Sequence, residues 1–103
     1  LGYNAEDLRL HLELQFKKGM SWDNYGIHGW HIDHIKPVSA FKFIKEDGSK
    51  NLEEITECWS LNNLQPLWAE ENQEKKNWYK FNDKMCRFSN GEVVEIREDS
   101  NYD

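Results

Sequence analysis

The chain has 103 residues, a length that suits a single domain with a modest hydrophobic core. It has 13 lysine and arginine residues and 19 aspartate and glutamate residues, which gives a net charge of −6. This charge argues against a negatively charged partner held by bulk electrostatic attraction alone. No apolar run approaches membrane-spanning length and no signal peptide is visible, so we expect a cytoplasmic protein without a membrane partner.

Charge is distributed unevenly along the chain. A basic run in the last third consists of Lys75, Lys76, Lys80, Lys84 and Arg87. The residues that follow are acidic, with Glu92, Glu95, Glu98, Asp99 and Asp103. Because an acidic protein can still present a locally positive face, the net charge does not decide the partner.

The cysteines and the first residues bear on the context of the chain. Cys58 and Cys86 are too few for a disulfide framework and have no CxxC spacing, so we expect two reduced thiols, with one bridge between them as the alternative. The sequence begins at Leu1 and Gly2 without a methionine. We therefore expect a fragment or a processed form, with room for an upstream domain.

Residues 4–19 predict a helix rather than a strand. A period-two alternation typical of a strand occurs at Leu8, Leu10, Leu12, Leu14 and Phe16. A helical stripe fits as well, at Ala5, Leu8, Leu12 and Phe16. The segment has no β-branched residue, Asn4 is a suitable N-cap and Gly19 can close the helix, so the helical interpretation is favoured.

The remaining elements follow from local patterns. We expect a loop at 20–29, a strand at 30–35 stopped by Pro37, a helix at 49–59 with Leu52 and Ile55 on its buried side, a strand at 61–68, a helix at 69–80, and a hairpin of residues 84–88 and 92–96 around Ser89-Asn90-Gly91. The predicted class is α+β, in the order helix, strand, short helix, strand, helix, hairpin.

Polar side chains gather in the segment WHIDHIKP, residues 30–37. On a regular strand His31 and Asp33 share one face and His34 points to the other. If the strand ends or bends near Pro37, Asp33 and His34 can flank one site. The alternative is a set of surface polar residues on an edge strand.

The chain resembles the HNH endonuclease family in three segments that occur in order. WHIDHIKPVSAF resembles the first half of the family motif and LNNLQPLWAEENQEKKN the second half. In that family a strand ending in Asp-His, a strand carrying Asn-Leu-Gln, and a helix with Asn or His followed by lysine three residues later build one ββα-metal site. This chain has Asp33-His34, Asn63-Leu64-Gln65, and Asn72 with Lys75. The resemblance covers residues 30–77, and LRLHLELQFKKGMSWDNYG looks like phage-encoded and homing-type members.

The resemblance implies one HNH nuclease domain over residues 1–103. Its ββα-metal core, two short antiparallel strands and a helix, would occupy about residues 20–80. An N-terminal helix would precede the core at residues 1–19, and a hairpin with an acidic tail would follow it at residues 81–103.

Two departures from the family pattern matter. Many HNH proteins hold a structural zinc ion with CxxC pairs, but Trp68 and Glu71 stand where the second pair would fall, so no structural zinc is expected. We expect aromatic residues to supply hydrophobic core instead, at Trp59, Trp68, Trp78, Tyr79 and Phe81. The last motif position is Asn72 rather than histidine, an HNN variant, and a carboxylate with an amide oxygen favours Mg²⁺ or Mn²⁺ over zinc.

The resemblance also implies a role for each motif residue. Asp33 and Asn72 would each give one oxygen to a single metal ion, and neutral His34 would take the proton from the attacking water. Asn63 would not touch the metal but would brace the His34 loop through backbone hydrogen bonds. The alternatives are a turn-capping role for Asn63 and a solvated helix position for Asn72.

Other polar residues are candidates for DNA contact. Lys75 and Lys76 follow Asn72 by about one helical turn, so at least one could hold a phosphate, although a solvated lysine pair is the alternative. His31 would contact phosphate or support Asp33, unless it is merely structural. His28 in the loop could reach DNA, whereas His11 is expected at the surface or in packing.

The expected function is a metal-dependent DNA endonuclease that leaves 5′-phosphate and 3′-hydroxyl ends. One metal site cuts one strand, so a monomer should act as a nickase, and double-strand cleavage would need a dimer, a partner or two successive events. Other phage or DNA-processing proteins are further possible partners, in packaging or homing, in a bacterial or phage-infected cell. The alternatives are a non-catalytic DNA- or protein-binding module of the same fold, and a structural zinc domain that uses His31, His34 and the cysteines.

Overall fold

The chain divides into two compact units, each built from two separate segments. The computed structural model describes residues 2–97, so Glu98, Asp99 and Asp103 of the predicted acidic tail lie outside the described residues. The first unit combines Leu1–Ile35 with Trp59–Lys76, and the second combines Lys36–Cys58 with Asn77–Asp103.

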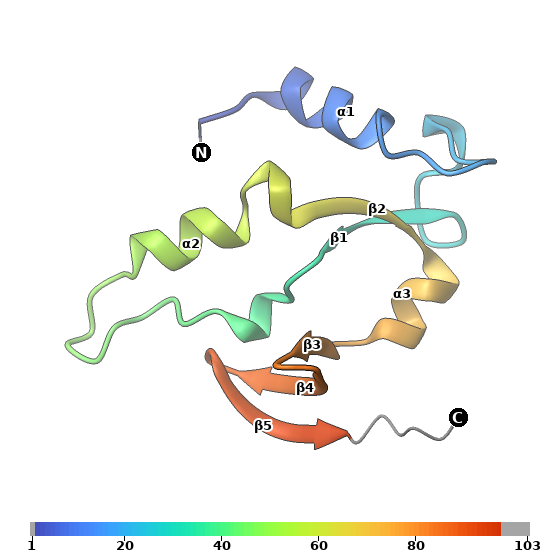
Figure 1. Ribbon diagram of the computed structural model, residues 1–103. Coiled ribbons are helices and arrows are strands. Elements are labelled where there is room, and N and C mark those ends of the chain that lie inside the picture. Colours follow the sequence, from blue (N-terminus) through green and yellow to red (C-terminus); the bar gives the residue numbers. More distant parts are fainter. Residues whose placement is uncertain (1, 98–103) are drawn as a thin grey trace. The chain divides into compact units, whose positions relative to one another are not determined.

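Within residues 2–97, three α-helices and two small antiparallel sheets give a mixed α+β fold, as predicted (Figure 1). The first unit contains α1 (Ala5–Glu13), the 3-10 turn η1 (Trp22–Asn24), β1 (Trp30–His34), η3 (Leu61–Asn63), β2 (Leu64–Trp68) and α3 (Ala69–Lys75). The second unit contains η2 (Val38–Ala40), α2 (Leu52–Cys58), β3 (Tyr79–Phe81), β4 (Lys84–Ser89) and β5 (Glu92–Arg97).

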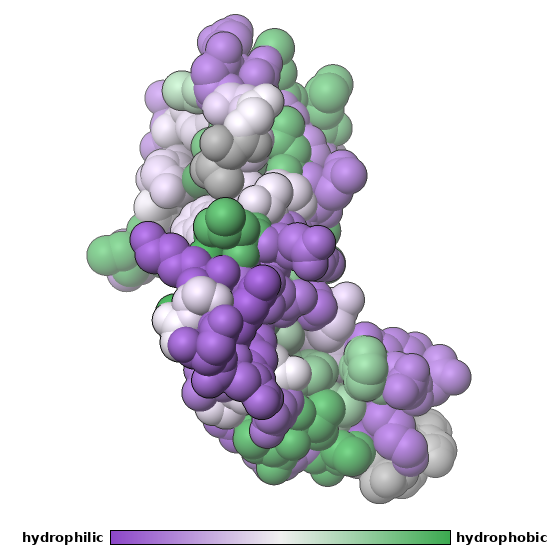
Figure 2. All heavy atoms as spheres, turned by 90° about the vertical axis from the view of Figure 1, so that its left-hand side faces the viewer, coloured by the Kyte–Doolittle hydropathy of each residue, from purple (hydrophilic) through white to green (hydrophobic). Residues whose placement is uncertain are grey.

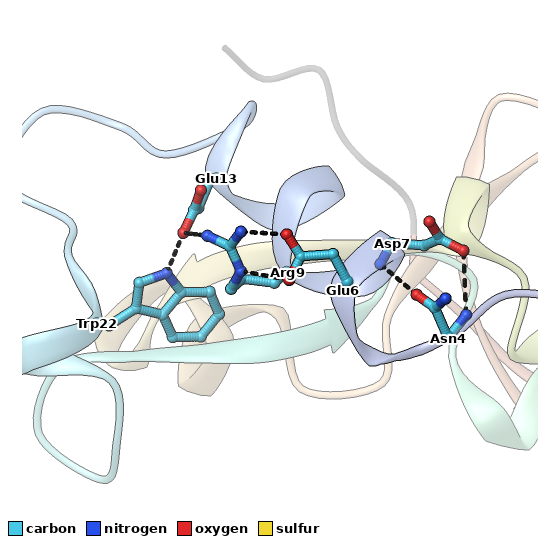
Figure 3. Close-up of polar contacts among 6 residues, drawn as sticks. All are labelled: Asn4, Glu6, Asp7, Arg9, Glu13 and Trp22. Carbon is cyan, nitrogen blue, oxygen red and sulfur yellow. Dashed lines mark hydrogen bonds and ion pairs between the residues drawn. The ribbon is translucent and has the colours of Figure 1, made fainter.

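Helix α1 begins where the sequence predicts. The backbone N–H of Asp7 donates to Oδ1 of Asn4 at 2.8 Å, and the Asn4 N–H donates to Oδ2 of Asp7 at 3.1 Å, which forms a capping box (Figure 3). The predicted end at Gly19 is wrong, because α1 stops at Glu13. The Gln15 side chain donates to the backbone carbonyl of His11 at 3.2 Å, so a carbonyl at this end is satisfied without further helix.

The exposed side of α1 is tied to the loop that follows it. Arg9 forms ion pairs with Glu6 and Glu13, and the indole N–H of Trp22 donates to the same Glu13 carboxylate at 2.6 Å (Figure 3). These contacts hold η1 against α1 within the first unit.

The core of the first unit forms between α1, the loop and β1. Its buried centre consists of Leu12, Met20 and Trp30, and partly buried Leu8, Phe16, Ile32 and Trp68 pack against it. Leu8, Leu12 and Phe16 of the predicted stripe therefore face the core, whereas Ala5 is exposed. Trp68 joins the core as expected. Trp59 and Phe81 are 43% and 46% exposed, so their predicted place in the core is wrong. Figure 2 shows other apolar residues at the surface beside hydrophilic ones.

Strands β1 and β2 pair antiparallel, and α3 follows β2 without a linker. The register places His31 opposite Leu67, Asp33 opposite Gln65, and His34 opposite Leu64. The predicted helix at 69–80 is too long, because α3 ends at Lys75. Lys76 has φ +49°, a conformation that cannot continue a right-handed helix.

The second unit contains a three-stranded meander in the order β3-β4-β5. Its β4–β5 hairpin turns at Asn90 and Gly91, with φ values of +51° and +81°, which confirms the predicted Asn-Gly turn. β3 was expected to be helical and is instead a strand. It joins β4 through Asn82 and Asp83, whose φ values are +53° and +65°.

Helix α2 confirms the predicted element but only part of its predicted buried side, because Ile55 is partly buried and Leu52 is not. Leu52 is 66% exposed, whereas Cys58 at the other end of the helix is fully buried. Cys58 and Cys86 are both buried and are not joined in a disulfide, as predicted. Burial raises the pKa of the Cys58 thiol, and the nearby Glu54 and Glu57 carboxylates add to this shift. Between residues 2 and 97, no helix has the length and apolar character needed to cross a membrane.

Candidate functional site

Strand β1 sends its polar side chains to opposite sides, as the alternation in the sequence predicts. His31 and Asp33 both contact residues of α3, while the His34 ring packs against Trp59. All of these residues lie in the first unit. The arrangement places a carboxylate and an imidazole in sequence at the end of one strand but in different surroundings.

Asp33 is a buried carboxylate with a complete set of donors. The ammonium of Lys75 donates to Oδ1 at 3.1 Å and to Oδ2 at 2.9 Å, and the Gln65 amide donates to Oδ2 at 2.9 Å. Asp33 is 7% exposed, so this nearby positive charge and the hydrogen bonds offset the cost of removing the carboxylate from water. Lys75 also donates to the backbone carbonyl of His34 at 2.6 Å.

Asn72 lies one helical turn before Lys75 and contacts His31, which is on the same face of β1 as Asp33. Its side-chain Nδ2 is 3.0 Å from Nδ1 of His31. Because an amide nitrogen can only donate, His31 accepts at Nδ1 and carries its proton at Nε2 when neutral. The Asn72 carbonyl oxygen takes no part in this hydrogen bond and is the atom suited to a cation.

His34 is held in an apolar setting. Its ring meets Trp59 edge-on, with centroids 4.5 Å apart and planes at 83°. The buried Nε2 has no hydrogen-bond partner among the described residues. Burial lowers the pKa of His34, the Asp33 carboxylate opposes that change, and the Lys75 ammonium adds to it. A pKa below the ordinary value of 6.5 favours the neutral imidazole near pH 7.

Asn63 fixes the chain as it leaves β1. The backbone N–H of Ile35, the residue after His34, donates to the Asn63 carbonyl at 2.8 Å. The Asn63 N–H donates to the Ser60 carbonyl at 3.0 Å, within the turn that leads into β2. Asn63 is 9% exposed, so it is part of the framework beneath the strand end rather than a surface turn residue.

The donors on this face suit a hard cation better than zinc. Among residues 2–97 no group of three histidine, cysteine, aspartate or glutamate residues could hold a metal ion. His31 and His34 lie on opposite sides of β1, which disfavours a zinc site built from both. One carboxylate oxygen from Asp33 and one amide oxygen from Asn72 fit a Mg²⁺ or Mn²⁺ ion that keeps much of its water. Such an ion would replace the Lys75 ammonium at Asp33.

The other predicted contact residues differ in their surroundings. Lys75 is directed to Asp33, whereas Lys76 is exposed at the end of α3 and His28 is exposed in the loop before β1. His11 packs between elements, because its Nε2 lies 2.9 Å from the Leu64 carbonyl. The contacts of Lys75, Lys76, His28 and His31 with DNA stay predictions.

Two residues that contribute to the site, Gln65 and Trp59, are not predicted from the sequence. Gln65 belongs to the Asn-Leu-Gln segment, and a strand register that pairs it with Asp33 could have identified it. Trp59 lies beside His34 because of a turn between α2 and η3, and no local pattern predicts that contact.

Comparisons with known proteins identify a viral relative. No family model matches the chain, and no solved structure matches it. An uncharacterized protein of Acanthamoeba polyphaga mimivirus is 38% identical over 77 residues, which is 75% of this chain and 31% of that protein. The chain thus spans about a third of the length of this curated relative.

Proposed function

We propose that the protein is a metal-dependent endonuclease that hydrolyses DNA phosphodiester bonds. Support comes from the order of elements in the first unit, two antiparallel strands followed directly by a helix, with polar residues at matching places. Asp33 and His34 end β1, Asn63 precedes β2, and Asn72 lies on α3.

One observation carries the proposal. His34 is a neutral imidazole, set one residue from a buried carboxylate, with a buried nitrogen that has no hydrogen-bond partner among the described residues. Buried polar atoms in folded proteins almost always have partners, and exceptions are frequent at functional sites. A neutral histidine next in sequence to a potential cation ligand, at the end of the strand, is the group that we expect to accept a proton near pH 7.

Each residue of the site has its own role in the proposed reaction. Asp33 and Asn72 would hold the ion, and Asn63 keeps the backbone after His34 in place. When bound, a divalent ion supplies positive charge that offsets the charge developing on the phosphate and on the departing 3′-oxygen. His34 removes the proton from the attacking water, and Lys75, released from Asp33, can contact a phosphate.

The products would carry 5′-phosphate and 3′-hydroxyl ends. A single site of this kind cuts one strand, so the monomer nicks, and a dimer, a partner or successive events are needed for a double-strand break. A role in phage packaging or homing rests only on the resemblance of the flanking residues.

Plasmid nicking tests the proposal. Supercoiled plasmid is incubated with EDTA, Mg²⁺, Mn²⁺ or Zn²⁺ in parallel. We expect nicking with Mg²⁺ or Mn²⁺ and none in EDTA. Asp33→Ala should lose both cutting and metal binding, while the matched control Asp23→Ala, an exposed residue of η1, should retain them.

His34→Ala separates proton transfer from metal binding. It should still bind Mn²⁺ and DNA but cut about 10²–10⁴-fold more slowly, the range typical of a positioned general base. A His34→Ala protein that cuts within threefold of the parent would overturn this role, and His31 would then be the next histidine to test.

A second candidate is a DNA- or protein-binding module that keeps this fold without catalysis. The observation in its favour is the Lys75 ammonium, which already satisfies both oxygens of Asp33. If Mg²⁺ and Mn²⁺ fail to bind at millimolar concentration while DNA binds, this alternative is preferred. Tightly held zinc in stoichiometric amount would instead indicate a structural zinc domain.

A further inference from the structure

The meander of the second unit has one inward and one outward face, which its register defines. Across the three strands, Tyr79, Cys86 and Ile96 form one row, and directly opposed residues point to the same side of a sheet. Cys86 is 2% exposed and the Phe88 ring packs against those of Tyr79 and Phe81, so this side is the packed one.

The alternate positions therefore form the outward face. Lys80, Met85 and Arg97 make one row across β3, β4 and β5, and Arg87 and Glu95 make the neighbouring pair. Lys80, Arg87 and Arg97 are exposed. Ser89 is the next outward residue of β4 and lies opposite Glu92, so the face carries three cations and two carboxylates. It is still a net positive surface on a chain whose net charge is −6.

Trp78, immediately before β3, organises the two arginines. The guanidinium carbon of Arg97 lies 4.8 Å from the Trp78 ring centroid and that of Arg87 lies 5.7 Å from it. Cation–π contacts of this kind hold planar guanidinium groups near the surface with their N–H edges available. Because the arginines occupy the indole, Trp78 serves as a support for them rather than as a platform for a stacked base.

We propose that this face, formed by Trp78, Lys80, Arg87, Glu95 and Arg97, binds the phosphate backbone of duplex DNA. Charge complementarity selects the occupant, since paired N–H donors of arginine match phosphate oxygens and the outward side chains present no base-reading geometry. The identity of the anion as DNA rests on the proposed function. The surface itself belongs to the second unit, whereas Asp33 and His34 belong to the first.

Glu95 limits how strongly this surface can attract phosphate. Its carboxylate accepts from Arg87 at 2.8 Å and neutralises one of the three cations. Both side chains are about half exposed, so the pair contributes little to folding and its removal should leave the fold intact. Glu95→Gln should therefore free Arg87 for phosphate.

DNA binding by the full chain in EDTA tests the surface. Anisotropy of a labelled duplex of about 20 base pairs, long enough to cover several phosphates, is measured across a range of salt concentrations. Replacing Arg87 and Arg97 with Gln should reduce the slope of log K against log salt by at least about 0.9, since each lost phosphate contact removes about 0.9 and Glu95 competes for Arg87 in the parent. Binding should weaken at least about tenfold near 0.1 M salt. The matched control, Lys45→Gln with Lys50→Gln, removes the same charge from an exposed loop of this unit and should keep the parent slope.

A gain of binding excludes misfolding as the explanation. Glu95→Gln should tighten DNA binding severalfold, whereas Glu53→Gln, an exposed control on α2, should not do so to the same extent. The proposal is overturned if the arginine variant keeps the parent slope, if Glu95→Gln changes nothing beyond its control, or if the parent does not bind duplex DNA. A parent that nicks plasmid but fails these tests leaves the proposed function standing, and one that passes them without nicking leaves only the surface.

Discussion

Lys75 Nζ lies 2.9 Å from Oδ2 of Asp33, and the two side chains are 20% and 8% exposed. The pair occupies the place where the proposed function requires a divalent ion. Under the proposed function, Lys75 would be an internal counter-ion that the metal replaces at Asp33.

Removing that counter-ion should make stability depend on the metal. Lys75→Met leaves the Asp33 carboxylate buried without its cation, and we expect a loss of about 2–3 kcal/mol in the free energy of unfolding in EDTA, below the range for fully buried pairs because Lys75 is partly exposed. Added Mg²⁺ should restore more stability to the variant than to the parent. Urea unfolding with and without Mg²⁺ measures both effects.

The matched control is Lys17→Met. Lys17 pairs with Glu71, but both side chains are about half exposed, and such pairs are worth less than about 1 kcal/mol. Equal losses in the two variants would contradict the argument from burial.

The His34 environment should make stability fall in acid. Burial lowers the pKa of His34 below its ordinary value of 6.5, so between the two values the unfolded chain binds more protons than the folded one. The free energy of unfolding should therefore fall as pH drops below 6.5 and level off below the folded pKa. Urea titrations in EDTA measure this contribution as the difference between the parent and His34→Gln. Exposed His28→Gln is the control, and an identical pH profile for His34→Gln and the parent would refute the assignment.

Leu12 should be the most costly aliphatic truncation on α1. It is 1% exposed at the centre of the first unit's core, so Leu12→Ala should destabilise the protein by about 2–5 kcal/mol. Leu14 is 88% exposed, and Leu14→Ala should change stability by less than about 0.5 kcal/mol. A thermal or urea unfolding comparison would refute the helical stripe if the two losses were similar.

A glycine in the β3–β4 turn should stabilise the protein. Asn82 and Asp83 both have positive φ, and a residue with a Cβ is disfavoured there. Asp83→Gly creates an Asn-Gly turn and should stabilise the protein by about 0.5–1 kcal/mol. Asp23→Gly, in the 3-10 turn η1, should act in the opposite direction because glycine gains nothing at negative φ. Denaturant midpoints distinguish the two signs.

Sequence patterns predict those features that local chemistry decides. The Asn4 cap, the opposite orientations of Asp33 and His34, and the Asn90-Gly91 turn each depend on a few neighbouring residues. Local signals fail to predict helix ends and burial where contacts with other parts of the protein determine them. Helix α1 ends before Gly19 and α3 ends at Lys75, while Leu52 is exposed although its spacing indicated burial.

In the candidate site, too, some features are predictable from the sequence and others are not. Asp33, His34, Asn63 and Asn72 follow from motif order, whereas the Lys75–Asp33 ion pair and the Trp59–His34 contact join residues far apart along the chain. Such contacts depend on tertiary packing, which a sequence pattern alone does not specify. Strand β3 was missed because its turn contains no glycine.

The division of both units into two chain segments has a consequence for how the protein forms. Strand β1 cannot pair with β2 until all of residues 35–63 have been synthesised, because that whole segment separates the two strands. Closing a loop of this length before its contacts form is entropically costly, and non-local strand pairing is generally slow. During synthesis, therefore, Asp33 and His34 emerge well before Gln65 and Lys75 can join them, and an arrest of translation within residues 36–58 would yield a chain without the site.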